Sequence, residues 1–386
     1  MSISRAGSLR FTGVSLQNWR NFKKVDIDLA RRVILVGPNA SGKSNFLDVF
    51  RYLQAIVSVG GGFQEATQER GGVSLIRCLA ARRFPEIVIR ATVGNDEELS
   101  IWTYELRFKQ DNRQRPILTK EKIEHRGVTF LDRPDADDGK DSERLSQTYL
   151  EQVNANKNFR DLAEFFKSIQ YLHIVPQLIR EPDRSLGKKN DPFGGDFLEQ
   201  IGRTPEKTRE AWLPRIRDAL KLAVPQMQDL EMVRDPRGIP HLKARYAHWR
   251  PNGAWQSESQ FSDGTLRLMG LLWALLRKSG PILLEEPELS LHPGVVSHLP
   301  QMFARMQRRS GRQILISTHS SDLLKDEGIG LDEVLLLEPG DEGTTIRLAA
   351  AIEDVKALLD GGLSLSEIVI PKTRPERVEQ LTFFLD

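Results

Sequence analysis

The stretch from Gly37 to Ser44 has the residue types and spacing of a phosphate-binding loop. It reads Gly37-Pro38-Asn39-Ala40-Ser41-Gly42-Lys43-Ser44, fits the pattern G-x-x-x-x-G-K-[ST] at every position, and is followed by Asn45. Glycines let backbone N–H groups turn inward around phosphate oxygens, and a helix that begins near Lys43 would point its positive end at the same anion. We expect Lys43 to reach the β- and γ-phosphates of the ligand and the Ser44 hydroxyl to bind Mg²⁺. An ordinary glycine-rich turn is the alternative, but a strand is expected before the loop and a helix after it, which favours the phosphate site.

Two adjacent acids end an apolar run later in the chain. The run is Ile282-Leu283-Leu284, and the acids are Glu285 and Glu286. Because ligands of parallel sheets bind at the carboxyl edge of the strands, we expect these acids beside the phosphate loop. Glu285 would then hold the Mg²⁺ shell, and Glu286 would polarise the attacking water. Without the loop, the same pair could be two surface acids that follow a strand.

A histidine ends another apolar run. Residues 314–316 are apolar, and Ser317, Thr318 and His319 follow them. If this run is a third strand of the same sheet, His319 lies at the carboxyl edge and could contact the γ-phosphate or the attacking water. A lone histidine is more often structural, so the hypothesis depends on this position.

The residues Ser262, Asp263 and Gly264 come directly before a long apolar stretch. Ser262 or Asp263 would cap the helix that begins there, and Gly264 would allow another backbone to approach closely. The N-terminus of such a helix is a second place where an anion could bind. An ordinary helix cap is the simpler alternative.

These residues require a sheet that is covered by helices. Alternating or continuous apolar runs predict strands at residues 10–16, 24–29, 33–36, 171–175, 281–284, 313–317 and 333–337. Residues 84–108 predict an antiparallel meander, and helical spacing predicts helices at 43–57, 149–167, 205–223 and 264–276. Strands that alternate with helices indicate an α/β fold with a parallel sheet. We interpret residues 131–144 as an exposed acidic loop and residues 185–196 as a flexible loop.

The composition fits a cytoplasmic protein with one large or two ordinary domains. The chain has 386 residues, of which 39% are hydrophobic and 28% charged, and no apolar run is long enough to span a membrane. A single cysteine, Cys78, excludes an internal disulfide and fits a reducing compartment. Because 55 Lys and Arg nearly balance 53 Asp and Glu, net charge argues neither for nor against nucleic acid.

Together these segments resemble the ABC-type ATPases, in the branch that contains the RecF, SMC and OLD proteins and stand-alone AAA-like ATPases. Residues 37–44 match Walker A, Ser262 to Thr265 the signature motif, and Ile282 to Glu286 Walker B. Leu289 to Pro293 falls where the D-loop belongs, His319 matches the switch histidine, and Gln177 is the Q-loop candidate, expected near the Mg²⁺. Residues 16–22 are similar to the branch's N-terminal motif, which implies that Arg20 lies near the nucleotide.

The resemblance implies a P-loop ATPase head that has a mixed sheet with helices on both faces, an antiparallel β lobe and a helical lobe. The expected parts are residues 1–180, which carry Walker A and the Q-loop, 181–260, a helical insertion, and 261–386, which complete the ATPase core. It also implies a homodimer that holds two ATP molecules, each between the P-loop of one copy and the signature of the other. Two positions depart from the family pattern, because Glu285 stands where Asp is usual and Asp263 where many relatives have Gly.

The partner is left open by the sequence. No heptads indicate an SMC coiled coil, and the segment after His319 is too short for the TOPRIM domain of OLD nucleases. One hypothesis is an ATP-gated DNA-binding protein in repair, recombination or antiphage defence, and its DNA surface would include Lys188, Lys189, Arg203, Lys207, Arg209 and a stacking Trp249. The alternative is a regulatory scaffold that controls a separately encoded toxic effector and binds DNA little. A small-molecule kinase and a transporter ATPase fit the signature and switch histidine less well.

Overall fold

The computed structural model describes residues 8–81, 84–181, 191–249, 254–277, 280–374 and 378–383. The chain divides into two compact units. The first comprises residues 1–170, 279–283 and 303–386, and the second comprises residues 171–278 and 284–302. The second unit thus takes in the expected insertion together with the signature and the Walker B acids. No helix in the described part of the chain is long and apolar enough to cross a membrane.

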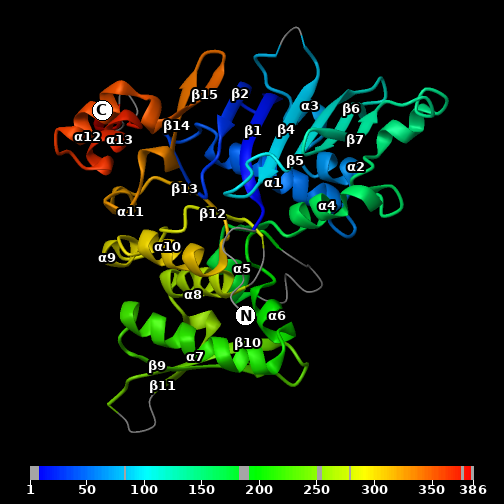
Figure 1. Ribbon diagram of the computed structural model, residues 1–386. Coiled ribbons are helices and arrows are strands. Elements are labelled where there is room, and N and C mark those ends of the chain that lie inside the picture. Colours follow the sequence, from blue (N-terminus) through cyan, green and yellow to red (C-terminus); the bar gives the residue numbers. More distant parts are fainter. Residues whose placement is uncertain are drawn as a thin grey trace. The chain divides into compact units, whose positions relative to one another are not determined.

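A six-stranded antiparallel sheet forms one layer of the first unit. Its order is β2-β1-β4-β5-β6-β7. The strands are β1 (Arg10–Trp19), β2 (Phe22–Asp28), β4 (Ile87–Gly94), β5 (Trp102–Gln110), β6 (Pro116–His125) and β7 (Val128–Arg133). The expected meander at 84–108 is therefore β4 and β5, and the sheet extends it by two strands. Figure 1 shows α1 (Lys43–Val57), α2 (Phe63–Gln68) and α4 (Arg160–Lys167) beside this sheet, with α3 (Val73–Ile76) near β5.

A mixed sheet carries the strands that end at the expected site. Its order is β15-β14-β3-β13-β12-β8. The strands are β3 (Arg32–Val36), β8 (Gln170–Leu172), β12 (Ile282–Glu285), β13 (Ile314–Thr318), β14 (Val334–Gly340) and β15 (Gly343–Leu348). The strands β13 and β14 both run parallel to β3, whereas β15 runs antiparallel to β14. The division between the units falls inside β12, after Leu283, and inside β8, after Gln170.

Aromatic side chains fill the core between α1 and the strands. Phe46 and Phe50 are fully buried, as their helical spacing predicts, and the Phe50 ring lies 4.6 Å from that of Phe11 on β1. The helix expected at 149–167 begins only at Arg160, because residues before it form turns in which the Asn156 side chain donates to the Leu150 carbonyl. Asparagine bonds its own neighbouring backbone readily, which favours turns over helix. The first unit also contains α11 (Ser321–Leu324), α12 (Glu353–Asp360) and α13 (Leu365–Lys372).

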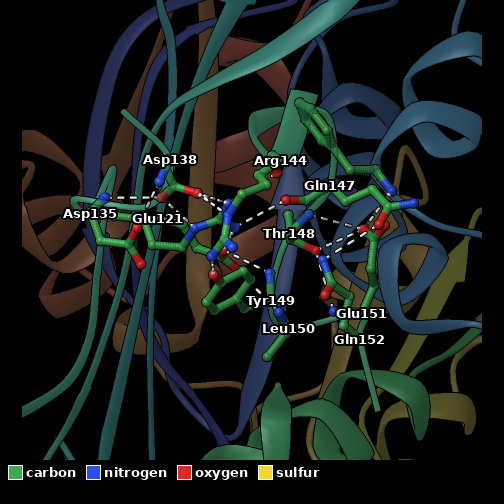
Figure 2. Close-up of polar contacts among 12 residues, drawn as sticks. Glu121, Asp135, Asp138, Arg144, Gln147, Thr148, Tyr149, Leu150, Glu151 and Gln152 are labelled. Carbon is green, nitrogen blue, oxygen red and sulfur yellow. Dashed lines mark hydrogen bonds and ion pairs between the residues drawn. The ribbon is translucent and has the colours of Figure 1, made fainter. Parts of the chain in front are cut away.

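Most of residues 131–144 is exposed, as the interpretation of an acidic loop expects, but one of its acids is buried. The segment begins as the end of β7, and its Asp138 is 2% exposed and pairs with Arg133, whose side chain is fully buried. Arg133 also pairs with Glu121 of β6, and its guanidinium lies 3.7 Å from the Tyr149 ring centre. Figure 2 shows Glu121, Asp138 and Arg144 converging on this cluster. Charge pattern alone could not predict it, because the partners come from four separate segments.

The second unit combines helices with a small sheet. Its helices are α5 (Pro176–Arg180), α6 (Phe197–Arg203), α7 (Glu206–Ala223), α8 (Asp263–Leu276) and α9 (Pro293–Val296), and α10 (Leu299–Ser310) crosses into the first unit. The insertion expected to be helical also contains a three-stranded antiparallel sheet, of β9 (Met227–Arg234), β10 (Pro240–Tyr246) and β11 (Ala254–Ser257). Leu242 and Ala244 alternate with polar residues on β10 and are fully buried in the same core as Ile216 and Leu220 of α7. That period of two is a strand signal. Half of the expected loop at 185–196, residues 185–190, lies outside the described residues.

Candidate nucleotide-binding site

The phosphate loop joins β3 to α1 in the first unit. The Lys43 ammonium donates to the carbonyl oxygens of Gly37 at 2.9 Å and Pro38 at 3.0 Å, so the loop curls around its own lysine. Ser44, in the first turn of α1, is exposed. The first turn contains no acid and Gly42 offers no capping side chain, so the positive end of the helix is not compensated from within the loop.

The loop glycines occupy positions that no other residue would fit without strain. Gly42 has φ of +97°, and a Cβ added there would lie 2.2 Å from the Asn21 side chain. A Cβ at Gly37 would lie 2.6 Å from Ser41 Oγ and 2.7 Å from the Leu337 carbonyl oxygen. The buried Ser41 hydroxyl has no hydrogen-bond partner among the described residues. Crowded glycines, an orphaned hydroxyl and a helix N-terminus without an acid fit a phosphate group.

Asn21 braces the phosphate loop through hydrogen bonds, although the sequence did not predict this role. Its amide nitrogen donates to the Ser41 carbonyl at 2.8 Å and to Thr344 Oγ1 at 2.7 Å, and its oxygen accepts from Asn45 at 2.8 Å. One side chain therefore ties the phosphate loop to the first turn of α1 and to β15. Its place in the N-terminal motif was the only signal in the sequence.

Arg20 lies beside α1, which carries Asp48. Its guanidinium donates to the Leu75 carbonyl and lies 3.8 Å from Asp48. Burial lowers the pKa of Arg20, while Asp48 acts in the opposite direction. These contacts lie outside the phosphate loop, and the expected contact of Arg20 with the nucleotide stays a prediction.

The strand register places His319 level with the start of the phosphate loop. Thr318 pairs with Val36 across the parallel strands β13 and β3, so His319 and Gly37 are the next residues of the two strands. His319 is partly exposed. Ser317, two residues earlier on β13, has a buried hydroxyl without a hydrogen-bond partner in the described part of the chain.

The expected Walker B acids, Glu285 and Glu286, lie at the end of β12, in the second unit. The hydroxyl of Tyr171, on β8, donates to Glu285 Oε2. Glu286 has φ of +43°, in the left-handed region that non-glycine residues rarely occupy. Backbone strain of this kind is concentrated at functional sites, where the surrounding structure holds it. Tyr171 was not predicted, since nothing local distinguishes it.

The residues of the expected signature form the N-terminus of α8 in the second unit. Ser262 is the N-cap and its hydroxyl accepts from the Thr265 N–H at 3.2 Å. Asp263 Oδ1 accepts from Arg180 at 2.6 Å, and the same nitrogen donates to the Phe261 carbonyl at 2.6 Å. A Cβ at Gly264 would lie 2.4 Å from the Ser290 carbonyl oxygen, so the glycine allows the D-loop residue to approach.

Two further side chains lie in this part of the second unit. Arg267 follows Asp263 by one helical turn, and burial lowers its pKa while Asp263 and Glu286 act in the opposite direction. Its Nε is buried and has no hydrogen-bond partner among the residues that the structure describes. Gln177 is exposed on the short helix α5.

The candidate Mg²⁺ ligands are divided between the units, Ser44 in the first and Glu285 in the second. In the described ranges no group of three or more His, Cys, Asp or Glu residues could hold a metal ion. A hydroxyl and a carboxylate suit Mg²⁺, which in nucleotide sites takes its remaining ligands from phosphates and water. Taken one by one, these side chains therefore suit Mg²⁺ that is bound together with a nucleotide.

Sequence comparison matches a family model over most of the chain. The model is described as "AAA domain, putative AbiEii toxin, Type IV TA system" and matches residues 32–325. A segment of 45 residues is 40% identical to "Endonuclease GajA" of Bacillus cereus (strain VD045). That segment covers 12% of this chain and only 8% of the length of the relative.

The fold is similar to solved SMC head domains. An Smc head bound to the C-winged helix domain of ScpA has a TM-score of 0.55 and 14% identity, over 87% of this chain and 96% of the solved one. An Smc head with an extended coiled coil, bound to the C-terminal domain of ScpA and derived from Pyrococcus furiosus, has a TM-score of 0.52 and 12% identity, over 92% and 99% of the two chains. The expected fold, an ABC-type P-loop ATPase head with a mixed sheet, is confirmed.

Proposed function

Because the chain belongs to this AbiEii-type AAA domain family of ATPases, we propose that it binds and hydrolyses ATP with Mg²⁺, and that two copies close around two ATP molecules. The observation that carries the proposal is the phosphate loop. The loop forms a cradle that suits a polyphosphate. Its glycines leave no room for a side chain, Lys43 donates to the loop's own carbonyl oxygens, and the first turn of α1 contains no acid.

Each residue then has a role in the proposed reaction. Mg²⁺ would bridge phosphate oxygens and neutralise charge that develops during transfer, with Ser44 and Glu285 as protein ligands. Lys43 would leave the loop carbonyls for the β- and γ-phosphates. Glu286 would orient and polarise the water, and His319 would contact the γ-phosphate, as its place level with Gly37 supports.

The proposed dimer gives a use to the signature end of α8. A helix N-terminus with an exposed Ser262 can donate to a phosphate, and it lies in a different unit from the phosphate loop. We propose that Ser262 and Gly264 of one copy contact the γ-phosphate held by the other, with Gln177 near the Mg²⁺. ATP would then join the copies, and hydrolysis would release them.

For the biological role we propose ATP-gated action on DNA, in repair, recombination or antiphage defence. The short likeness to a protein named as an endonuclease supports a nucleic-acid context. Of the expected DNA surface, Lys188 and Lys189 lie outside the described residues, while Lys207 and Trp249 are exposed.

One observation favours the alternative, a regulatory ATPase that controls a separately encoded effector. Arg203 pairs with Glu199, and Arg209 donates to the Thr204 carbonyl, so two of the expected DNA-binding cations are already engaged. The net charge of +2 adds little attraction for DNA.

The test is steady-state ATP hydrolysis with and without linear double-stranded DNA, at low and moderate salt, with Glu286→Gln as the blank. Stimulation by DNA that fades with salt supports the DNA role, because phosphate contacts release counterions. Turnover that ignores DNA supports the effector role. No turnover above the blank contradicts the proposed hydrolysis.

A further inference from the structure

The two residues that depart from the family pattern both contact one short segment, Tyr171–Arg180. Glu285 accepts a hydrogen bond from the Tyr171 hydroxyl, and Asp263 pairs with Arg180 at 2.6 Å. We propose that Tyr171 and Arg180 are positioning residues that compensate these departures. Tyr171 orients the Glu285 carboxylate for Mg²⁺, and Arg180 neutralises Asp263 so that a phosphate can approach α8. This inference rests on the proposed ATP-dependent function.

The segment is anchored well enough to position side chains at both of its ends. Ile179 is fully buried and Ile174 is 5% exposed, and both belong to the core of the second unit. Pro176 starts α5 and restricts its backbone. Tyr171 precedes this anchored stretch and Arg180 ends it, so the end of β12 and the start of α8 are both bonded to the same segment of chain.

The contact between Tyr171 and Glu285 restricts the position of the Glu285 carboxylate. A glutamate has one more rotatable bond than an aspartate, so its carboxylate occupies more positions. Tyr171 lies on β8, the neighbour of β12 in the sheet, and its ring has few rotamers. A neutral hydroxyl donor fixes the carboxylate but leaves its negative charge in place, which a hard cation requires. A lysine or arginine at this place would compete with Mg²⁺ for the carboxylate.

The contact at Asp263 answers an electrostatic need. The first turn of α8 attracts anions, yet a carboxylate in that turn repels an incoming phosphate. Arg180 offsets this charge and also donates to the Phe261 carbonyl, so it holds the residues on both sides of the Ser262 cap. The pair Arg180–Asp263 thus presents little net charge, as the usual glycine would.

The first test is a cycle of Tyr171→Phe and Glu285→Asp. The readout is the affinity for Mn²⁺, used in place of Mg²⁺, in electron paramagnetic resonance titrations with saturating non-hydrolysable ATP analogue. Tyr171→Phe should weaken Mn²⁺ binding about tenfold, as the loss of an outer-shell contact typically does, with nucleotide affinity in EDTA unchanged. In the Glu285→Asp background the same change should cost less than about twofold, because the shorter side chain no longer depends on Tyr171. Equal losses in both backgrounds would overturn the role of Tyr171.

The second test is a cycle of Arg180→Ala and Asp263→Gly. The readout is the ATP-dependent dimer, measured by light scattering in the Glu286→Gln background. Arg180→Ala should weaken the dimer at least about tenfold, because it removes the cation that bonds Asp263 directly and leaves only Arg267, one helical turn away, to offset its charge. Adding Asp263→Gly should restore most of that loss. A double variant as weak as Arg180→Ala alone would overturn the role of Arg180. Arg180→Lys, which keeps the charge, should lie between the wild type and Arg180→Ala.

Melting temperatures and Lys43→Ala distinguish a failure of this inference from a failure of the proposed function. The four substitutions of the two cycles, and Arg180→Lys, should leave the melting temperature near that of the wild type. Lys43→Ala should abolish nucleotide-dependent Mn²⁺ binding and dimerisation. A wild type that shows neither property would overturn the proposed function and this inference with it. A wild type that shows both, with no coupling in either cycle, would overturn this inference alone.

Discussion

The N-termini of α1 and α8 are two candidate phosphate sites that are built in opposite ways. The start of α1 has a glycine at the N-cap, no capping side chain and no acid in its first turn. The start of α8 has a serine cap that bonds Thr265 and an acid, Asp263, that pairs with Arg180. The N-terminal N–H groups of α1 remain available to a ligand. At the start of α8, in contrast, hydrogen bonds and an ion pair within the protein already satisfy part of the donors and offset the charge of the acid.

This difference indicates different affinities for phosphate. A preorganised, uncompensated cradle should bind nucleotide within one protomer. A capped and neutralised helix start should bind weakly and contribute only when another surface presents the phosphate. The stability of the ATP-dependent dimer would then depend on the N-terminus of α8, and the affinity for nucleotide on the N-terminus of α1.

Changes in the phosphate loop should have the largest effect. Lys43→Ala removes the charge that would meet the β- and γ-phosphates, and we expect ATP affinity to fall by at least about 100-fold in isothermal titration calorimetry. Ala40→Gly is the matched control, because Ala40 has φ of +61°, which glycine adopts freely. It should keep the affinity within about twofold. Normal affinity in Lys43→Ala would contradict the phosphate-loop assignment.

The Walker B glutamate should separate turnover from binding. Glu286→Gln keeps the shape of the side chain but removes the base, so turnover should fall by about 10²–10⁴-fold with ATP binding retained. The variant should accumulate as an ATP-bound dimer in light scattering. A monomer in the presence of ATP and Mg²⁺ would count against the dimer mechanism.

A substitution at Gly264 should affect only the function of α8, which is dimerisation. A Cβ there would lie 2.4 Å from the Ser290 carbonyl oxygen, so Gly264→Ala must displace either α8 or the D-loop. We expect dimerisation to weaken about tenfold while a protomer binds ATP normally, which corresponds to about 1.4 kcal/mol. If Gly264→Ala lowers the ATP affinity of the protomer as much as Lys43→Ala does, the two helix starts do not act separately.

A substitution at Asn21 should have a moderate effect, and only on nucleotide binding at the start of α1. Asn21→Ala removes three hydrogen bonds, to Ser41, Asn45 and Thr344, that brace the phosphate loop. Since a bond of this kind contributes about 1 kcal/mol, we expect a five- to tenfold loss of ATP affinity at roughly unchanged dimerisation by bound protomers. Thr344→Val removes one of the three contacts and should cost about twofold. Equal effects of the two substitutions would show that Asn21 acts only through β15.

The buried ion cluster around Arg133 should leave ATP chemistry unchanged and affect stability instead. Burial raises the pKa of Glu121 to about 7, although Arg133 and the N–H groups of Tyr149 and Leu150 act in the opposite direction. An acid with a raised pKa binds its proton more tightly in the folded state, so its stabilising contribution is present below about pH 4 and is lost as the pH rises to about 7. This contribution is about 3 kcal/mol.

Urea unfolding at a series of pH values between 4 and 7.5 measures this effect. Glu121→Gln should flatten the decline in the free energy of unfolding, with turnover per folded molecule unchanged. A decline as steep as that of the wild type would assign the pH dependence to other groups, among them Glu151, whose pKa burial also raises.

The local pattern of residues was enough to predict the α/β class, the ends of the strands and helices around the phosphate loop, and the loop itself. These features depend on contacts within a few residues, such as the glycine-to-helix transition at Gly42 and Lys43 and the apolar run of β3. Backbone geometry and hydrophobic period are written in consecutive residues, so they can be read without a structure.

The partners of the charged and polar side chains needed the folded chain. Asn21 meets Thr344, Tyr171 meets Glu285 and Arg180 meets Asp263 across long stretches of sequence. Asp138 looked solvated in the sequence but is buried, because Arg133 and Glu121 lie on neighbouring strands. The small sheet of β9–β11 was likewise missed among helices. A side chain's chemistry is given by its type, but its charge state, orientation and strain depend on neighbours that only tertiary packing brings within hydrogen-bond distance.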